Sequence, residues 1–329
     1  MNYMNYLVFF VLIVAGGSLY KTWEIKELDK DKGKTNEHIK DFLLNRSNKQ
    51  SDDIFTRPFI WIHVDNELNA RNWDSFGSRS NRNLNKPYMY YCIKSIIKKC
   101  DKVFNVCLID DTSFKRLLDN WTIDFDSLDI TLKNKVRSLA QAKLLYEYGG
   151  VLVPGSFVCS RSLKDLYFKN VNKNGMFACE KLDDTSYVTQ RRYLPDNTFM
   201  GCKRKHKVMR NYCIHLEQLI STDYTSESDF TDSTSKYLSN LVNDDKLSLV
   251  NGKHIGIKDI NGADIQLEDL LNTQFIEFLE ESYGIYIPDK KLSKRTAYNW
   301  FLHIDIKSLL DSEMVISKHM LLSNEGEGL

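Results

Sequence analysis

The sequence lacks most of the signals that would name a chemistry directly. Its 45 Lys and Arg side chains face 44 Asp and Glu side chains, so the net charge of +1 gives no basic excess of the kind that nucleic-acid binding requires. It contains no G-x-x-x-x-G-K-[ST] phosphate loop, no G-x-G-x-x-G, no H-E-x-x-H and no G-x-S-x-G. These absences argue against a nucleic-acid binder, a kinase, a metalloprotease and a serine hydrolase.

The cysteines also lack a pattern, because none of the seven belongs to a C-x-x-C pair. This excludes a zinc ribbon and a dense disulfide framework. We expect most of them to be small buried hydrophobic residues. One or two disulfides are compatible with an oxidising compartment, but the sequence does not pair the cysteines. They are Cys92, Cys100, Cys107, Cys159, Cys179, Cys202 and Cys213.

The chain is long enough for one extensive core, with 329 residues of which 42% are hydrophobic. Its N-terminus is different, because residues 6–20 (YLVFFVLIVAGGSLY) carry no charge. This run predicts an uncleaved signal anchor; a cleaved signal peptide and a buried helix are the alternatives. We therefore expect a membrane segment at 1–20, a polar stalk at 21–54 and a globular domain at 55–329.

The expected location is the membrane, with a single N-terminal span, and the signals for its orientation conflict. Lys21 and Lys26 follow the apolar run and no Lys or Arg precedes it, which favours a cytosolic globular domain. Two N-x-[ST] sequons, at Asn45 and Asn120, are compatible with the opposite orientation. The sequence leaves the side of the membrane open.

The most informative segment is residues 133–153, where a helical pattern stops at two glycines. Val136, Leu139, Ala140 and Leu144 lie on one face of the predicted helix. Gly149 and Gly150 can end it with positive φ, and the apolar residues 151–153 predict a buried strand. The carboxyl end of such a strand commonly faces a ligand cleft.

The same alternation of strand and helix recurs along the chain. Residues 59–65 and 103–109 predict strands, and residues 86–100 predict a helix with Tyr90, Ile93, Ile96 and Ile97 facing the core. This order is typical of a mostly parallel sheet flanked by helices. In the final third we expect a polar loop at 223–236, a strand at 255–257 and a helix at 267–279.

Two segments carry a family resemblance, RSLAQAKLLYEYGGVLV (137–153) and FIWIHVDNELNARNW (59–73). They resemble sugar-nucleotide glycosyltransferases related to capsular polysaccharide synthesis proteins and to the Asp-x-Asp sugar-binding family. The resemblance covers about residues 57–215 and implies a glycosyltransferase-A-like α/β fold. It also implies a nucleoside-diphosphate sugar as donor, a glycan or lipid-linked acceptor, and an activity of the hexosyltransferase type.

The chain departs from this family where the family binds its metal. The family places an Asp and an Arg on the helix and an Asp-x-Asp after the following strand, and this chain has Ser138, Gln141 and Pro154-Gly155-Ser156 there. Divalent cations such as Mn²⁺ require oxygen ligands, which paired carboxylates supply and these residues do not. A divalent metal therefore lacks its usual ligands in this chain, and no metal ligand is predicted.

The predicted donor-binding residues lie at or after predicted strands, on the helix before Gly149 and in the glycine turn itself. Carboxylates and amides can contact ribose or uracil, and a guanidinium can replace metal charge at the diphosphate. Asp110 and Asp111 are the best substitutes for the missing carboxylates, although Asp111 is equally well placed to cap the next helix. The set comprises Asp65, Asn66, Arg71, Asp110, Asp111, Arg137, Gly149, Gly150 and Ser156.

Two further segments are candidates for the acceptor side. Asp196 can act as general base on an acceptor hydroxyl, with Asn197 orienting the donor, but Pro195-Asp196-Asn197 is also a favoured turn. The basic run 203–207 predicts a solvated turn before a helix, or a clamp on a diphosphate or an acidic acceptor.

Together these features predict a membrane-anchored glycosyltransferase that moves a sugar from a nucleoside-diphosphate donor to a glycan or lipid-linked acceptor. The alternative is an inactive protein of the same fold that serves as a binding or scaffold module, because the family's metal-binding residues are missing. A structural membrane protein of unrelated fold is a third possibility.

Overall fold

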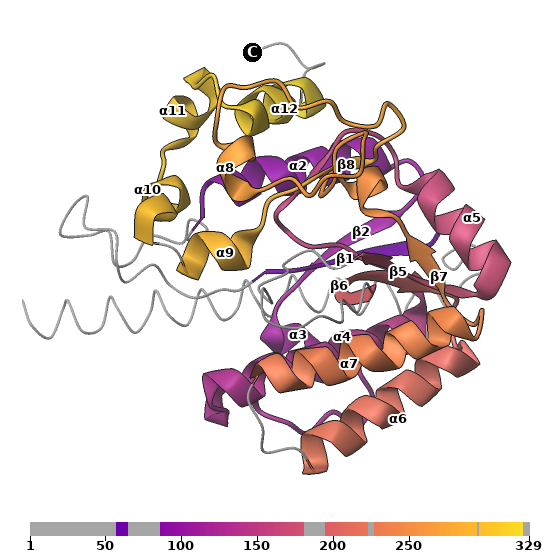
Figure 1. Ribbon diagram of the computed structural model, residues 1–329. Coiled ribbons are helices and arrows are strands. Elements are labelled where there is room, and N and C mark those ends of the chain that lie inside the picture. The colour runs from indigo at the N-terminus through magenta and orange to yellow at the C-terminus, as the bar shows by residue number, and fades with distance from the viewer. Residues whose placement is uncertain (1–56, 65–85, 181–194, 223–226, 295, 325–329) are drawn as a thin grey trace, which may run out of the picture. The chain divides into compact units, whose positions relative to one another are not determined.

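A six-stranded sheet forms the centre of the protein, as seen in a computed structural model (Figure 1). Its order is β2-β1-β3-β6-β5-β7, and only β6 runs against the other five strands. The mostly parallel sheet predicted from the sequence is confirmed. The strands are β1 (Phe59–His63), β2 (Asn105–Ile109), β3 (Gly150–Leu152), β5 (Met176–Glu180), β6 (Pro195–Cys202) and β7 (Ser248–Val250).

The structure describes residues 57–64, 86–180, 195–222, 227–294 and 296–324. All of them belong to one compact unit, Arg57–Leu329. The predicted membrane segment at 1–20 and the stalk at 21–54 lie outside the described residues. In the described part of the chain, no helix is both long enough and apolar enough to cross a bilayer.

Helices cover both faces of the central sheet (Figure 1). The two helices α2 (Tyr88–Cys100) and α5 (Lys164–Asn174) pack with Ile60 and Ile62 of β1 in one apolar cluster. On the other face the ring of Trp61 lies 5.7 Å from that of Tyr148 in α4. Alternate residues of β1 thus point to opposite layers, as expected of a strand buried on both sides. The helices of this second layer are α3 (Asp111–Leu117), α4 (Ile130–Tyr148), α6 (Lys207–Thr222) and α7 (Glu227–Asn243).

A third layer packs on the outer side of α2 and contains much of the C-terminal third (Figure 1). A two-stranded sheet, β4 (Phe157–Cys159) with β8 (Gly284–Tyr286), joins it to the rest. Tyr88 and Cys92 of α2 share this second apolar cluster with Val158 and Phe301. The helices are α8 (Leu267–Leu270), α9 (Asp289–Lys294), α10 (Asn299–Leu302), α11 (Ile306–Asp311) and α12 (Val315–Asn324).

The unit α4–β3 follows the sequence closely. The four residues predicted to face the core from this helix are all buried. Asp129 caps the N-terminus by accepting a hydrogen bond from the N–H of Thr131 at 3.0 Å. Gly149 ends the helix with a φ of 72°, and Gly150 enters β3 with a φ of 98°. The glycines therefore make the turn that their sequence predicts.

Other predictions need correction. In α2, Ile93 and Ile96 are buried, but Tyr90 is 52% and Ile97 40% exposed. Packing against two layers rotates the buried face toward Tyr88, Cys92 and Cys100. In the final third, the predicted loop 223–236 is helical from Glu227 on, where α7 begins. The predicted strand 255–257 is wrong, because Ile255 ends a 3-10 turn, η3 (Gly252–Ile255), and a turn follows it. The predicted helix 267–279 ends at Leu270. Polarity alone misled the first of these predictions, because α7 is a solvent-facing amphipathic helix.

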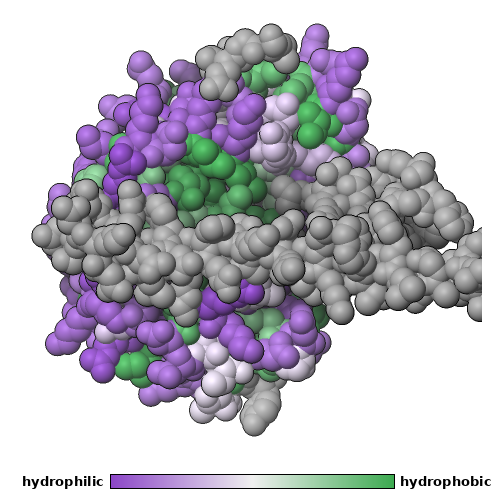
Figure 2. Space-filling view, turned by 180° about the vertical axis from the view of Figure 1, so that it is seen from behind, coloured by the Kyte–Doolittle hydropathy of each residue, from purple (hydrophilic) through white to green (hydrophobic). Residues whose placement is uncertain are grey.

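The coloured part of the face in Figure 2 is mainly hydrophilic, with a patch of hydrophobic residues near its centre. The two short 3-10 turns η2 (Phe125–Ser127) and η4 (Thr296–Tyr298) complete the described elements.

Candidate functional site

The candidate site lies where β1, β2 and β3 end. The parallel registers pair His63 with Ile109 and Trp61 with Leu152, so the carboxyl ends of these three strands meet at one edge of the sheet. We call this the carboxyl edge. The antiparallel strand β6 enters the sheet at the same edge, because Met200 pairs with Leu152 and the strand begins at Pro195.

The strand order places a topological switch point at this edge. The chain leaves β1 to form β2 on one side, and then crosses through α3 and α4 to form β3 on the other side of β1. In open α/β sheets ligands bind in the crevice outside the carboxyl ends of two such strands. The crevice expected here lies between His63, which ends β1, and Pro154-Gly155, which follow β3.

Three side chains from three segments meet beside this point. His63 Nε2 lies 3.0 Å from Asp111 Oδ1, and Arg137 donates to both carboxylate oxygens of Asp111, from Nε at 2.8 Å and Nη2 at 2.7 Å. The His63 ring also stacks on that of Phe114 at 5.7 Å. We call these three residues the His63–Asp111–Arg137 cluster.

The cluster is largely removed from solvent. The exposed fractions of the side chains are 11% for His63, 19% for Asp111 and 12% for Arg137. Burial by itself would raise the pKa of Asp111, but the hydrogen bonds and charges of His63 and Arg137 outweigh it and hold that pKa well below its usual range. Asp111 is therefore ionised at neutral pH and balances the charge of Arg137.

Local structure explains why Asp111 is able to reach Arg137. Asp110, not Asp111, is the N-cap of α3, since its side chain accepts hydrogen bonds from the N–H and the hydroxyl of Ser113 at 2.9 and 2.7 Å. The prediction that Asp111 caps this helix is wrong by one residue. Because Asp110 supplies the cap, the carboxylate of Asp111 can turn toward α4.

This arrangement changes the expected role of Arg137. Its Nε and Nη2 are directed at Asp111, and Nη1 lies 3.3 Å from the side-chain oxygen of Asn134. The bidentate geometry is the strong form of this ion pair. Arg137 therefore holds Asp111 in place, and the structure does not present it as a free phosphate ligand.

Asp196 and Asn197 come to the same edge from β6. They begin a strand, so the predicted turn at these residues is wrong. Asp196 Oδ1 accepts hydrogen bonds from the N–H and the hydroxyl of Thr198 at 2.9 and 3.0 Å. The strand order places them on the far side of β3 from His63.

The other predicted donor-binding residues are not brought to the cluster. Gly149 and Gly150 lie at the opposite edge of the sheet, where Gly150 pairs with Cys202 and packs on Phe59. Ser156 is only 2% exposed. Asp65, Asn66 and Arg71 lie outside the described residues.

The basic run is also distant from the cluster. Residues 203–207 follow β6 at the opposite edge, where Lys205 pairs with Glu147 of α4. The prediction of a turn before a helix is confirmed, because α6 begins at Lys207. At this edge the run is not placed to bind a diphosphate held beside His63.

Two polar residues of the carboxyl edge were not predicted as site residues. His63 ends β1, and its place at the end of a predicted strand was the available signal. Glu180 ends β5 and is 5% exposed, with its carboxylate 2.5 Å from Lys258 Nζ and 3.0 Å from the N–H of Gly252. Its partners lie more than seventy residues away, so the sequence held no sign of this ion pair.

A cavity of about 210 Å³ opens beside Asp111, between α3 and η2. Its lining combines cations, carboxylates and apolar side chains, including Lys115, Arg116, Asp124, Ile123 and Phe125. It is smaller than the roughly 300–1,000 Å³ typical of pockets for drug-sized ligands. It can admit one ring or one charged group of a larger ligand.

At the end of β3, where the family resemblance implies ligands of a divalent metal, the residues present do not supply them. Pro154-Gly155-Ser156, at the end of β3, offer no carboxylate. Among the described residues there is no group of three or more His, Cys, Asp or Glu side chains arranged to hold a metal ion. We therefore derive no step that passes through a metal.

Comparison with known proteins adds two remote structural likenesses. No family model and no curated protein matches the sequence. A solved structure of the galactosyltransferase LgtC with donor and acceptor sugar analogs aligns with a TM-score of 0.31 at 11% identity, covering 59% of this chain and 73% of that one. An active-site mutant of LgtC gives 0.32 at 12% identity with the same coverage. TM-scores of this size do not establish a shared fold.

Proposed function

We propose that this protein is a glycosyltransferase that binds a nucleoside-diphosphate sugar at the carboxyl edge, between the ends of β1 and β3. The observation that carries the proposal is the topological switch point flanked by the His63–Asp111–Arg137 cluster. The resemblance of residues 59–73 and 137–153 to sugar-nucleotide glycosyltransferases supports the same assignment. The acceptor is a glycan or a lipid-linked sugar, and residues 1–20 anchor the protein in a membrane.

The cluster has a positioning role in this proposal. Arg137 fixes the carboxylate of Asp111, and Asp111 orients the imidazole of His63 through Nε2. A fixed imidazole at the end of β1 can contact a donor bound at this edge. The neutral ring accepts a hydrogen bond from a ribose hydroxyl, and only the protonated ring can donate to a phosphate oxygen as well as to Asp111. Backbone N–H groups near Gly155 are the second set of donors, because a residue without a side chain lets a ligand approach closely.

On the acceptor side Asp196 is the candidate general base. It lies at the same edge as the cluster, with β3 between them. Its carboxylate is oriented by Thr198 through Oδ1, and a carboxylate fixed at this edge can accept a proton from an acceptor hydroxyl. The hydroxyl oxygen would then attack the anomeric carbon, and the nucleoside diphosphate would leave with the bonding electron pair.

Donor binding is tested by thermal unfolding of the full-length chain with a panel of nucleotide sugars and free nucleoside diphosphates. A ligand that binds the folded state raises the melting temperature. We expect saturable stabilisation by one class of donor, and a loss of at least about tenfold in affinity in His63→Ala, which removes about 1.4 kcal/mol or more of binding free energy. Lys205→Ala, at the opposite edge, is the matched control and should bind as the wild type does.

The outcome that contradicts the proposal is a melting temperature unmoved by every donor and diphosphate. Equal weakening in His63→Ala and Lys205→Ala would place the site elsewhere.

An inactive binding module is the second candidate, and one observation favours it. Asp111 and Arg137 neutralise each other, and no carboxylate follows β3. A donor that binds but is neither transferred nor hydrolysed over long incubation with candidate acceptors would support this alternative. Release of the free diphosphate, abolished in Asp196→Asn while binding persists, would support the transferase.

A further inference from the structure

The cavity of about 210 Å³ between α3 and η2 shares Asp111 with the His63–Asp111–Arg137 cluster. A series of packed rings also connects the two, because the ring of Phe114 lies 5.7 Å from that of His63 and 5.6 Å from that of Phe125. Phe125 is one of the residues that line the cavity. The cavity therefore adjoins the proposed donor site and can hold one part of the same ligand.

The order of the strands indicates which part of the donor reaches the cavity. Asp111 begins α3, which follows β2, whereas Asp196 lies at the start of β6. The order β2-β1-β3-β6 puts the crevice between β1 and β3 in the middle of these two residues. In the proposed reaction the sugar faces Asp196. The nucleoside at the other end of the diphosphate then extends toward Asp111 and the cavity.

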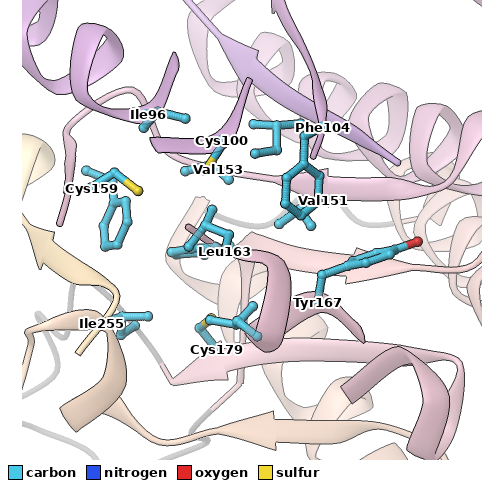
Figure 3. Close-up of a cluster of buried hydrophobic side chains, with 14 of the residues drawn as sticks. Ile96, Cys100, Phe104, Val151, Val153, Cys159, Leu163, Tyr167, Cys179 and Ile255 are labelled. Atoms are coloured by element: carbon cyan, nitrogen blue, oxygen red, sulfur yellow. The ribbon is translucent and has the colours of Figure 1, made fainter. Parts of the chain in front are cut away.

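The layer on the opposite face of β1 is closed to a polar group. Ile96, Val153 and Leu163 are buried there in the apolar cluster between α2, α5 and the central sheet (Figure 3). Three cysteines belong to the same cluster as buried free thiols, as expected of small hydrophobic residues: Cys100, Cys159 and Cys179. A polar base would have to displace such side chains, so we expect the base on the side of α3.

The lining of the cavity offers hydrogen-bonding groups of both kinds. Lys115 and Arg116 supply only donors, and the carboxylates of Asp124 and Asp126 supply only acceptors. Asp124 caps η2 by accepting the N–H of Asp126 at 3.2 Å. Among the described residues, no hydrogen bond or ion pair engages the Asp126 carboxylate or the Lys115 ammonium, and both residues are exposed. These two groups are available to a ligand.

We propose that this cavity binds the base of the donor and that the base is guanine, so that the donor is a guanosine-diphosphate sugar. The inference rests on the proposed function and names its donor class. Asp126 accepts hydrogen bonds from the guanine base, Lys115 donates to it, and the face of the base lies against Phe125. A cavity of this size holds one planar base and leaves the ribose and the diphosphate outside.

The choice of guanine follows from the two kinds of lining group. Guanine presents two neighbouring donors, N1–H and the 2-amino group, which one carboxylate can accept together. Its acceptors O6 and N7 are the atoms that Lys and Arg recognise on this base. Uracil presents one N–H between two carbonyl oxygens, and a carboxylate that faces this N–H also repels those oxygens. Guanine is therefore the base that matches both the carboxylate and the cations.

Calorimetric titration of the full-length chain with nucleoside diphosphates tests the assignment. We expect GDP to bind at least about tenfold more tightly than UDP, because only guanine satisfies both kinds of lining group. Inosine diphosphate differs from GDP only by the missing 2-amino group. It should bind about tenfold more weakly than GDP, since one hydrogen bond to the carboxylate is lost.

The variant Asp126→Asn shows whether this carboxylate reads the amino group. GDP and inosine diphosphate should bind Asp126→Asn within about twofold of each other, because the amide no longer favours two adjacent donors. Asp119→Asn carries the same substitution at an exposed position outside the cavity, and it should keep the discrimination of the wild type.

Two results would overturn the guanine assignment alone. UDP could bind more tightly than GDP, or the ratio between GDP and inosine diphosphate could be the same in Asp126→Asn as in the wild type. In both cases a nucleotide binds and the proposed function stands. No binding by any nucleoside diphosphate would overturn the assignment and the proposed function together.

Discussion

The two edges of the central sheet are built from different residues for different purposes. At the carboxyl edge, polar side chains of His63, Asp111 and Asp196 gather around the ends of the strands. At the opposite edge, where β3 begins, the backbone itself is the packing surface. A Cβ at Gly150 would lie 2.2 Å from the carbonyl oxygen of Phe59, and one at Gly149 2.7 Å from the N atom of Arg204.

The difference shows that a glycine pair can be diagnostic of a fold without belonging to its site. Gly149 and Gly150 have positive φ and close contacts, both of which are requirements of the turn from α4 into β3. They are six and five residues before Gly155, which lies at the other edge and has room around it. A strand of only three residues therefore separates the structural glycines from the candidate binding site.

The largest difference between the two edges should be seen when a glycine at each end of β3 is replaced by alanine. Gly150→Ala places a methyl group on a backbone oxygen at a φ of 98°, so we expect a loss of about 3 kcal/mol or more in the free energy of unfolding. Urea unfolding monitored by circular dichroism measures it.

Gly155→Ala is the control for this prediction. Its Cβ would meet Ile62 Cγ2 at 3.7 Å and the His63 oxygen at 3.9 Å, which are ordinary contacts. We expect a change below about 1 kcal/mol. Equal destabilisation by the two substitutions would show that the two edges are not different in the way described.

The next effect should come from the buried ion pair. Asp111→Asn leaves the charge of Arg137 without its carboxylate in a site where the Arg137 side chain is 12% exposed. We expect a loss of about 2 kcal/mol in the free energy of unfolding, measured by urea titration at pH 7. A double-mutant cycle with Arg137→Met should give a coupling energy of about 1 kcal/mol or more. A coupling energy near zero would mean that this ion pair does not contribute to the free energy of unfolding, as is found for many exposed ion pairs.

The pH dependence should follow from the lowered pKa of Asp111. Its folded-state pKa lies below the unfolded value of about 3.9, so the stabilisation is fully present above that value and is lost as pH falls toward the folded pKa. The stability gap between the wild type and Asp111→Asn should therefore shrink by about 1 kcal/mol between pH 5 and pH 3. A gap that stays constant over this range would argue that Asp111 is not held ionised by the cluster.

The smallest effect should come from the ion pair at the opposite edge. Glu147 and Lys205 are 37% and 49% exposed, and water screens their attraction. Glu147→Gln should change the free energy of unfolding by less than about 0.5 kcal/mol, in contrast to Asp111→Asn. A loss as large as that of Asp111→Asn would remove the distinction between the two pairs.

Much of the fold was predictable because it depends on local patterns. The helix before Gly149, the strand after Gly150, β1, β2 and the strand–helix alternation all follow from hydrophobic spacing and turn residues. The third layer was not predictable, since short elements such as β4, β8 and α8–α12 lack a clear period and gain their stability from packing on α2.

The candidate site was predictable only in part. Asp111 was selected because it follows a predicted strand, Arg137 as a charge that could replace the metal, and Asp196 as a possible general base. The structure brings all three to one edge of the sheet. The contacts between these residues were not predictable, because Asp111 and Arg137 are 26 residues apart and His63 is 48 residues from Asp111. No local pattern encodes which of two adjacent aspartates caps a helix and which one turns to a neighbouring helix.

The sequence by itself determined an α/β protein with a mostly parallel sheet, the glycine turn into β3 and the absence of the carboxylate pair after that strand. These features depend on residues that are close along the chain. Only the tertiary structure decided that Arg137 pairs with Asp111, and that Gly149 and Gly150 lie away from the cluster. Such contacts depend on strand register and on the packing of distant segments, which are fixed only when the whole core forms.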